Sequence, residues 1–277
     1  MTQPTIYQKI REAVDAIQNR SGITPEIGII LGSGLGAIAE QLTDSVVMAY
    51  TEIPHFHGTS VEGHAGQMIL GKFQGIPAVI LQGRFHLYEG YSMEDVVFPT
   101  RTVCGLGVQT LLLTNAAGGI NTRFRPGDLM LIEDHINWHQ MEENERAALS
   151  QVFKQHRGVE FYDRPLRKLA REASINSKVH LHEGVYLSLP GPAYETRSEI
   201  LMFRSINVDA VGMSTIPEAI WAKALDMKVL GISCITNSTY FAKAMSETSH
   251  EEVVTIAKKA SKNIDTLLKA IISNIIF

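Results

Sequence analysis

The sequence has little cysteine, no excess of basic residues and no long apolar run, and each absence narrows the class of protein. Cys104 and Cys234 are the only two cysteines and lie in apolar stretches, so we expect small buried thiols and a cytoplasmic protein. The net charge of −4 argues against nucleic-acid binding, which needs a clustered basic face. No apolar run reaches the roughly 18 residues of a membrane span, and no charged start precedes an apolar core, so we expect neither a membrane segment nor a signal peptide.

The composition is that of a globular protein with a substantial core. Hydrophobic residues make up 45% of the 277 positions and charged residues 19%. No internal repeat or low-complexity linker divides the chain. Residues 1–277 are therefore predicted to form a single domain.

Short apolar runs alternate with helical patterns along the whole chain. Strands are predicted at 27–31, 110–113, 129–132, 184–188, 208–211 and 229–234, a hairpin over 67–82, and helices at 6–18, 93–106, 217–225 and 253–272, the last with a capping box from Ser249 to Glu252. Residues 140–157 are polar and are expected at the surface. The alternation indicates an α/β fold with a mixed, mostly parallel sheet.

Ligands of such folds collect at the carboxyl ends of the strands. Four polar motifs follow predicted strands: Ser33, Asn115–Ala116, Met213–Ser214 and Thr236–Asn237. We therefore expect them to converge on one site.

A carboxylate and an amide follow two conspicuous motifs, Glu195 in PGPAYET (190–196) and Asn237 in ITN (235–237). If they converge on one pocket, they can bind a heterocycle that carries both an N–H donor and an oxygen or nitrogen acceptor. A 6-oxopurine is such a ring.

Several upstream groups suit an oxyanion. The glycine-rich turn at 32–36 can offer backbone N–H groups and the Ser33 hydroxyl. Arg84 offers a planar fork, and His86 faces the same way if the segment is extended. His64 lies between glycines, and the small residues at 115–119 let the Ala116 N–H approach a ligand. A tight turn, a surface ion pair or a core histidine remain the alternatives for each, but a purine site beside a phosphate site suggests that phosphate attacks a nucleoside.

Two other interpretations of the motifs are a dinucleotide site and a metal site. The turn at 32–37 fits G-x-G-x-x-A, and Glu52 lies about 20 residues further on, as in a dinucleotide-binding fingerprint. The histidine pairs at 55 and 57, 135 and 139, and 180 and 182 suggest a metal, but none has carboxylates or thiolates at zinc spacing. We expect no metal site.

Taken together, these motifs resemble the trimeric purine nucleoside phosphorylases over nearly the whole chain. The motifs are long and in the family's order: GSGLG at 32–36, HAG at 64–66, QGRFHLYEG at 82–90, TNAAGG at 114–119, GDLM at 127–130, DHIN at 134–137, GP at 191–192, YET at 194–196, VGMSTIPE at 211–218 and ITN at 235–237. The resemblance implies an α/β sheet with a distorted barrel flanked by helices, and a homotrimer with its sites near subunit interfaces. It implies purine nucleoside and phosphate as ligands and no cofactor, phosphate being a co-substrate.

The resemblance also assigns roles to individual residues. Phosphate would be bound by Ser33, His64, Arg84, His86, the Ala116 backbone and Ser214; the nucleoside by Tyr88, Tyr194, Glu195, Met213, Asn237 and His250; the catalytic candidates are Asn237, Glu195 and His86. Tyr194 stands where the family usually has phenylalanine. The segment that lends an aromatic to the neighbouring subunit departs from the family pattern, so that Phe153, His156 or Phe161 is a candidate, and 238–245 follow no assignable pattern.

His250 is expected in the first turn of the last helix, where the dipole disfavours protonation and a neutral imidazole can bond the ribose 5′-hydroxyl. Solvent exposure is the alternative for this residue. The predicted reaction is phosphate-dependent cleavage of 6-oxopurine nucleosides to free base and α-ribose 1-phosphate, a step of purine salvage. A 5′-methylthioadenosine phosphorylase is an alternative that Asn237 and His250 disfavour; an NAD-binding dehydrogenase and a non-catalytic nucleoside or phosphate binder are the others. The sequence does not rank inosine, guanosine and xanthosine.

Overall fold

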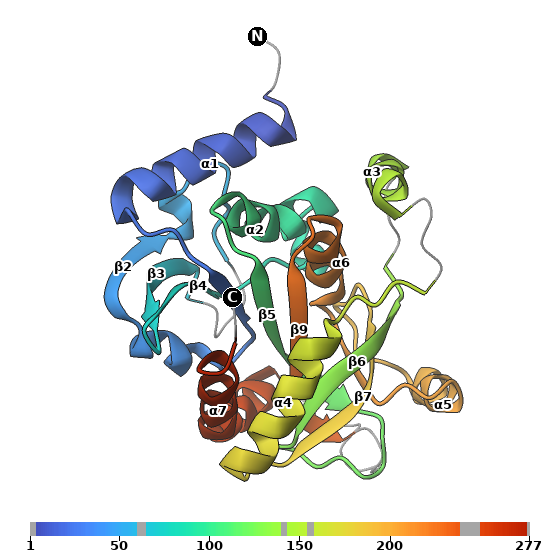
Figure 1. The fold of residues 1–277 in the computed structure, drawn as a ribbon. Coiled ribbons are helices and arrows are strands. Elements are labelled where there is room, and N and C mark those ends of the chain that lie inside the picture. The colour runs from blue at the N-terminus through green and yellow to red at the C-terminus, as the bar shows by residue number, and fades with distance from the viewer. Residues whose placement is uncertain (1–3, 60–64, 140–142, 154–157, 239–249, 276–277) are drawn as a thin grey trace.

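A computed structural model describes residues 4–59, 65–139, 143–153, 158–238 and 250–275 (Figure 1). The strands are β1 (Ile27–Leu31), β2 (Thr43–Ala49), β3 (Gln67–Phe73), β4 (Ile76–Gln82), β5 (Thr110–Gly119), β6 (Leu129–Asn137), β7 (Leu181–Ser188), β8 (Ala210–Gly212) and β9 (Lys228–Ser238). The α-helices are α1 (Ile6–Ser21), α2 (Met93–Gly105), α3 (Glu143–Phe153), α4 (Arg164–Ser177), α5 (Arg197–Ser205), α6 (Ile216–Ala224) and α7 (His250–Ile272). Short 3-10 helices are η1 (Gly36–Gln41), η2 (Tyr50–Glu52) and η3 (Leu87–Glu89).

These strands form one mixed sheet whose second half closes into a ring. The order is β2-β3-β4-β1-β5-β8-β7-β6-β9, and β9 also pairs with β5. The β1–β4, β1–β5, β5–β9, β6–β7 and β7–β8 pairs are parallel and the other four are antiparallel. The predicted α/β fold with a mixed sheet and a distorted barrel is therefore confirmed.

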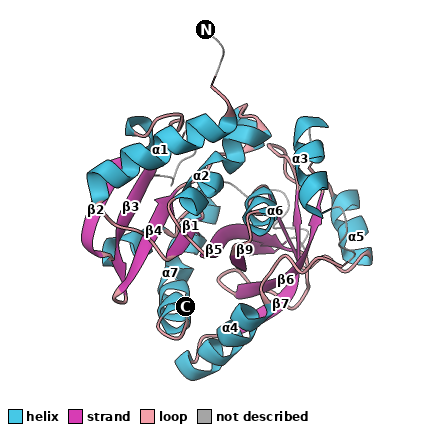
Figure 2. Ribbon diagram, turned by 45° about the horizontal axis from the view of Figure 1, so that its top comes forward, coloured by secondary structure: helices cyan, strands magenta, loops and turns pink. Residues whose placement is uncertain are grey.

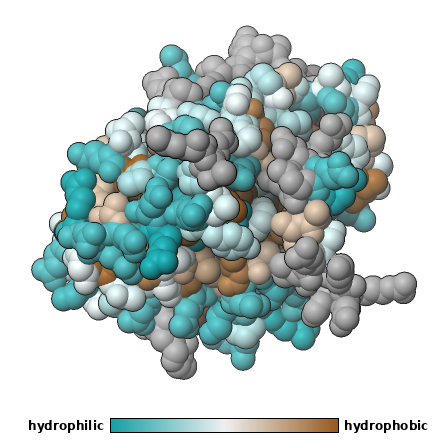
Figure 3. Space-filling view, turned by 90° about the horizontal axis from the view of Figure 1, so that it is seen from above, coloured by the Kyte–Doolittle hydropathy of each residue, from teal (hydrophilic) through white to brown (hydrophobic). Residues whose placement is uncertain are grey.

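Helices cover both faces of the sheet (Figure 2). One buried cluster joins α1, α2 and α6 to the sheet, and another joins α4, α7 and η1 to its other side. All five residues of β1 are buried, as expected for a parallel strand covered on both faces. The face drawn in Figure 3 is mostly hydrophilic, with its apolar residues in small patches.

Most predicted elements are present, and the hairpin is confirmed. Its strands β3 and β4 pair antiparallel, and Gln74 and Gly75 take positive φ angles of 53° and 81° at the turn. The polar stretch after residue 140 contains α3, and Ser249 of the predicted capping box lies outside the described residues. Cys234 is buried as predicted, but Cys104 is partly exposed.

The placement of two motifs beyond the ends of their strands was wrong. β5 runs to Gly119 and β9 to Ser238, so Asn115–Ala116 and Thr236–Asn237 lie within paired strands. The two strands continue side by side through both motifs, with the parallel pairs Asn115↔Ser233, Ala116↔Cys234 and Gly118↔Asn237. A register shift follows Ala117, near the site.

The dinucleotide-binding interpretation was also wrong. A dinucleotide turn opens an α-helix that returns to a parallel strand beside the first. Here the turn leads into η1 and then β2, whose pairing within the described residues is antiparallel and with β3, not β1. The Glu52 carboxylate, expected to bind a ribose, instead pairs with Arg20 at 3.0 Å on the surface.

The described residues also bear on metals and membranes. No group of three or more potential metal ligands occurs among them. No helix within the described ranges is long and apolar enough to cross a membrane.

Candidate active site

A cavity with an empty volume of about 670 Å³, open to solvent, lies where β5, β8 and β9 meet the loops after β1 and β4. It is lined by Gly32, Ser33, Arg84, His86, Tyr88, Ala116, Ala117, Gly118, Tyr194, Glu195, Val211, Gly212, Met213, Ser214, Thr236, Asn237 and Val253.

The cavity gathers every predicted site residue whose side chain the structure describes. These are Ser33, Arg84, His86, Tyr88, Ala116, Tyr194, Glu195, Met213, Ser214 and Asn237. His64 lies outside the described residues. His250 is the first residue of α7 and its side chain is not described, but Val253, three residues on, lines the cavity.

The glycine turn after β1 brings Ser33 to the cavity by close backbone packing. The Gly32 N–H donates to Thr114 Oγ1 at 3.1 Å, and a Cβ on Gly32 would lie 2.7 Å from the Cα of Asn115. Gly34 has a φ of +80°, and a Cβ there would lie 2.7 Å from Ala257 Cβ on α7. Glycine is therefore required at both positions, because a side chain would push the turn away from β5 and α7.

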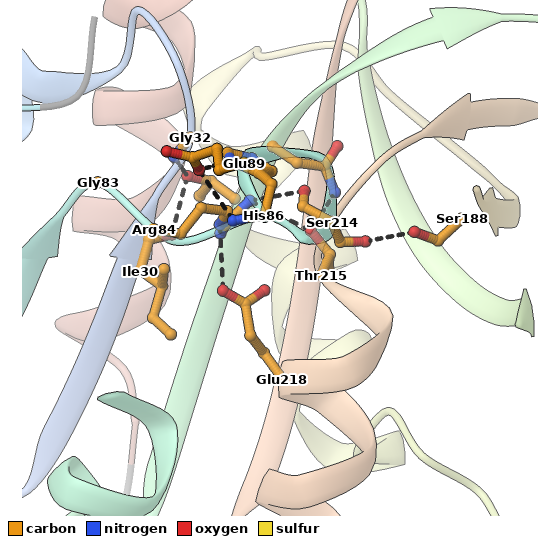
Figure 4. A network of polar contacts seen from close by, with 12 residues as sticks. Ile30, Gly32, Gly83, Arg84, His86, Glu89, Ser188, Ser214, Thr215 and Glu218 are labelled. Atoms are coloured by element: carbon orange, nitrogen blue, oxygen red, sulfur yellow. Dashed lines mark hydrogen bonds and ion pairs between the residues drawn. The ribbon is translucent and has the colours of Figure 1, made fainter. Parts of the chain in front are cut away.

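Arg84 is buried, with 3% of its surface exposed, in the loop that follows β4. Tyr50 fixes the start of this loop by donating its hydroxyl hydrogen to the Gly83 carbonyl at 2.8 Å. Arg84 Nη1 donates to Ser214 Oγ at 3.0 Å and to Thr215 Oγ1 at 3.3 Å, and Nε lies 3.1 Å from a carboxylate oxygen of Glu218 (Figure 4). The guanidinium thus has a defined orientation beside the cavity.

His86 is oriented by Glu89, whose side chain is 3% exposed. Glu89 Oε1 lies 2.8 Å from His86 Nδ1 and accepts the backbone N–H of His86 at 2.9 Å. A carboxylate accepts hydrogen bonds, so this contact places a proton on Nδ1 and fixes the orientation of the ring. The imidazole also stacks on Tyr88, with 4.7 Å between ring centroids.

Thr215 is the centre of a γ-turn. Its φ of 76° and ψ of −46° are accompanied by a hydrogen bond from the Ile216 N–H to the Ser214 carbonyl at 2.9 Å. Such a turn with positive φ is rare and strained, especially for a β-branched residue. Asn115 Nδ2 donates to Thr215 Oγ1 at 2.9 Å, and Ser188 Oγ donates to the Ser214 carbonyl at 2.9 Å, so both sides of the turn are fixed.

Glu195 and Asn237 form the other part of the cavity lining. Burial raises the pKa of the Glu195 carboxyl above its ordinary value, although the side chain is only partly buried. Asn237 Oδ1 accepts from Thr236 Oγ1 at 3.2 Å, which orients the amide so that its NH₂ group can donate to a ligand. The condition set out for this carboxylate and this amide is met, since both line the same cavity.

Four polar residues that organise the site were missed in the sequence: Glu89, the side chain of Asn115, Thr215 and Glu218. The spacing His86-x-x-Glu89 was a usable signal, because residues three apart can meet within one turn. Glu218 had none, since its partner Arg84 lies far away in the sequence.

Comparison with known proteins agrees with this geometry. Residues 26–273 match the family model described as the phosphorylase superfamily. The chain belongs to the phosphorylase superfamily. It is 43% identical to purine nucleoside phosphorylase 1 of Bacillus subtilis over 96% of this chain and 98% of that protein. It is 37% identical to the purine nucleoside phosphorylase of Rattus norvegicus over 97% and 96% of the two chains.

A solved member of this superfamily has the same fold. It is isoform 2 of purine nucleoside phosphorylase from Schistosoma mansoni, in complex with cytosine and ribose-1-phosphate. The TM-score is 0.87 at 36% identity, and 98% of each chain is covered.

Proposed function

We propose that this protein cleaves 6-oxopurine nucleosides with inorganic phosphate, giving free base and α-ribose 1-phosphate, as a step of purine salvage. The observation that carries the proposal is one cavity lined by a cationic, hydroxyl-rich group around Arg84 and by the pair Glu195 and Asn237. The relatives named purine nucleoside phosphorylase, and the ribose-1-phosphate bound to the Schistosoma protein, support it.

Phosphate binds at the cationic end of the cavity. Arg84 supplies the charged guanidinium and His86 a further hydrogen-bond donor. The hydroxyls of Ser33 and Ser214 donate to the other phosphate oxygens. The N–H of Ala116 and, by family resemblance, His64 complete the set. These groups place one phosphate oxygen beneath the anomeric carbon of the sugar.

The purine binds at the other end. An ionised Glu195 accepts the N1–H of a 6-oxopurine, and the Asn237 amide donates to N7 or O6. Adenosine has no hydrogen on N1, so the bond to Glu195 is lost, and it carries an amino donor where a 6-oxopurine has the acceptor O6. Tyr88, Tyr194 and Met213 are placed to contact the sugar and the base, with His250 toward the 5′-hydroxyl.

In the reaction the C1′–N9 bond breaks and its electron pair stays on the purine, while a phosphate oxygen bonds to C1′ from the opposite face. The purine takes up a proton and leaves as the neutral base. Asn237 accelerates the step to the extent that its hydrogen bond strengthens as charge builds on the ring. Fixing phosphate and sugar together supplies the entropic part. Phosphate is a co-substrate, and the proposed chemistry uses no metal or redox cofactor.

We also propose a cytoplasmic homotrimer with its sites near the subunit interfaces. Leu201, Met202 and Ile206 on or beside α5 are exposed apolar residues, and Trp138, also exposed, packs against Phe203 of the same helix. Tyr194 of the cavity is 50% exposed and lies shortly before α5 in the sequence. Such a group of apolar side chains is typical of a protein interface. Light scattering on the purified protein would give the mass of a trimer, and a monomer mass would contradict the proposal.

Three residues are candidates for the aromatic side chain that reaches the neighbouring subunit's site. Phe153 and Phe161 contact each other, and Phe161 packs on His135, while His156 lies outside the described residues. Which of the three aromatic candidates reaches a neighbouring site is decided by alanine substitutions and the Michaelis constant for nucleoside.

The function is tested by measuring base release from inosine, adenosine and 5′-methylthioadenosine, each with and without phosphate. Release from inosine that requires phosphate is the expected result. Preference for 5′-methylthioadenosine would favour the sister enzyme, and nucleoside binding without release would favour a non-catalytic binder.

A further inference from the structure

Glu218 is a buried carboxylate that does not line the cavity. It is 2% exposed and its partner Arg84 is 3% exposed, with 3.1 Å between the carboxylate oxygen and Nε. Because Glu218 lies behind Arg84 as seen from the cavity, any influence on a ligand passes through the guanidinium (Figure 4).

The segment that carries Glu218 is rigid. Pro217 stands in the first turn of α6 and restricts the backbone there, and the helix follows directly on the γ-turn at Thr215. A carboxylate in the first turn is also favoured by the helix dipole. Arg84 therefore contacts a single preformed unit through three of its residues: Ser214, Thr215 and Glu218.

These contacts hold the guanidinium from two sides. Glu218 holds the Nε edge, and the two hydroxyls hold Nη1. Strain at Thr215 persists because its hydroxyl accepts from both Arg84 and Asn115. A side chain that is ordered before the ligand arrives loses less entropy on binding, and this raises affinity.

Glu218 also carries a charge that phosphate does not need. Its negative charge repels a phosphate dianion and so weakens the attraction of Arg84 for it. Glu218 must therefore contribute to the site in another way. A buried arginine without a counter-charge is costly. Glu218 supplies the counter-charge whenever the cavity holds no phosphate, and so keeps Arg84 in place through each cycle of binding and release.

We propose that Glu218 is a positioning residue that sets the affinity for phosphate by orienting Arg84. This inference rests on the proposed function in taking phosphate as the ligand. It predicts an effect on phosphate that is confined to variants in which Arg84 is present, and little effect on the nucleoside.

The test is calorimetric titration with inorganic phosphate of the wild type and of the variants E218A, E218Q, E218D, R84A and R84A/E218A. E218A and E218D, which remove or withdraw the carboxylate, should weaken phosphate binding by about tenfold or more. E218Q removes the counter-charge of the buried ion pair and should weaken phosphate binding to a similar extent. E52A, which breaks the exposed pair with Arg20, is the matched control and should leave phosphate binding unchanged.

Two further readouts separate positioning from a merely structural role. The Michaelis constant for inosine should change by no more than about twofold in E218A and E218D, and the double variant should bind phosphate no more weakly than R84A, because coupled residues are not additive. Equal loss for phosphate and inosine, additive losses in the double variant, or an E218Q that binds phosphate as tightly as the wild type would each overturn the proposal. If E218A does not fold, E218Q and E218D still decide.

The outcome is distinguishable from failure of the proposed function. A wild type that releases no base with phosphate present would refute that function. An active wild type whose phosphate affinity is the same in E218D would refute the role of Glu218 alone.

Discussion

Replacing Arg84 by lysine keeps the positive charge and removes the planar fork, so it tests the geometry of the phosphate site rather than its charge. The arginine uses two nitrogens to reach Ser214, Thr215 and Glu218 at 3.0, 3.3 and 3.1 Å. Lysine offers one nitrogen on a flexible stem. The buried Glu218 keeps a cation nearby, which limits the loss of stability that alanine would cause.

The magnitude follows from the contacts that one ammonium cannot make. Lysine keeps one or two of the three contacts and no longer presents a nitrogen to phosphate in a fixed orientation. A lost hydrogen bond to a charged group costs about 1.5–3 kcal/mol. At about 1.4 kcal/mol for each factor of ten, the Michaelis constant for phosphate should rise by roughly ten- to a hundredfold.

The assay is initial velocity of base release, with phosphate varied at saturating inosine and inosine varied at saturating phosphate. The constant for inosine should change by less than about threefold, because Arg84 does not form the base end of the cavity. Arg20→Lys, in an exposed ion pair with Glu52, is the control and should match the wild type. Equal increases in both constants, or an unchanged phosphate constant, would refute the assignment of Arg84 to phosphate.

Three further predictions concern the nucleoside. Asn237→Asp should shift preference toward 6-aminopurine nucleosides, because a carboxylate accepts from an amino group and repels a keto oxygen; an unchanged ratio of kcat/KM for inosine and adenosine would count against this role. Burial raises the pKa of Glu195 above its ordinary 4.5, and the ionised form accepts N1–H, so kcat/KM for inosine should fall on acidification with a midpoint above pH 4.5. Glu195→Gln should abolish this limb and should leave the free energy of unfolding at neutral pH unchanged or higher, since a raised carboxyl pKa lowers stability as pH rises through it; a wild-type pH profile in the variant would contradict the prediction. His250→Val should lower activity on inosine and narrow the penalty against 5′-deoxyinosine, since an unsatisfied polar group costs about 1–3 kcal/mol; equal losses on both substrates would indicate a purely structural histidine.

Local patterns predicted the elements of the fold well. Gln74 and Gly75 take positive φ at the hairpin turn. Glycine favours this conformation, so its position in the sequence indicates the turn. The buried strand 27–31 and the long last helix follow from apolar runs and helical periodicity. The barrel came from the family resemblance, because its closure through β5–β9 and β6–β9 joins strands far apart in the chain.

The lengths of β5 and β9 show a limit of reading apolar runs. Asn115 and Asn237 are polar, so the apolar run ends before them, yet both remain in the parallel ladder. Polar residues occur inside these strands because the cavity lies at that end of the sheet. A hydrophobicity pattern places the end of a strand where apolar side chains give way to polar ones. The backbone hydrogen bonds between β5 and β9 continue beyond that point.

The residues that line the cavity were predicted, and the residues that orient them were not. Arg84 and Asn237 stand in distinctive motifs, but the γ-turn at Thr215 depends on hydrogen bonds from Arg84 and Asn115 that only the folded chain provides. The dinucleotide interpretation failed for a related reason. The G-x-G-x-x-A pattern describes a tight turn, and the element after it, here a 3-10 helix, decides what the turn binds.

The most direct test of the whole account is a product balance for inosine. Purified protein is incubated with inosine with and without inorganic phosphate, and hypoxanthine and α-ribose 1-phosphate are both quantified. We expect no release without phosphate and equal amounts of the two products with it. Hypoxanthine accompanied by free ribose, or released equally fast without phosphate, would contradict it.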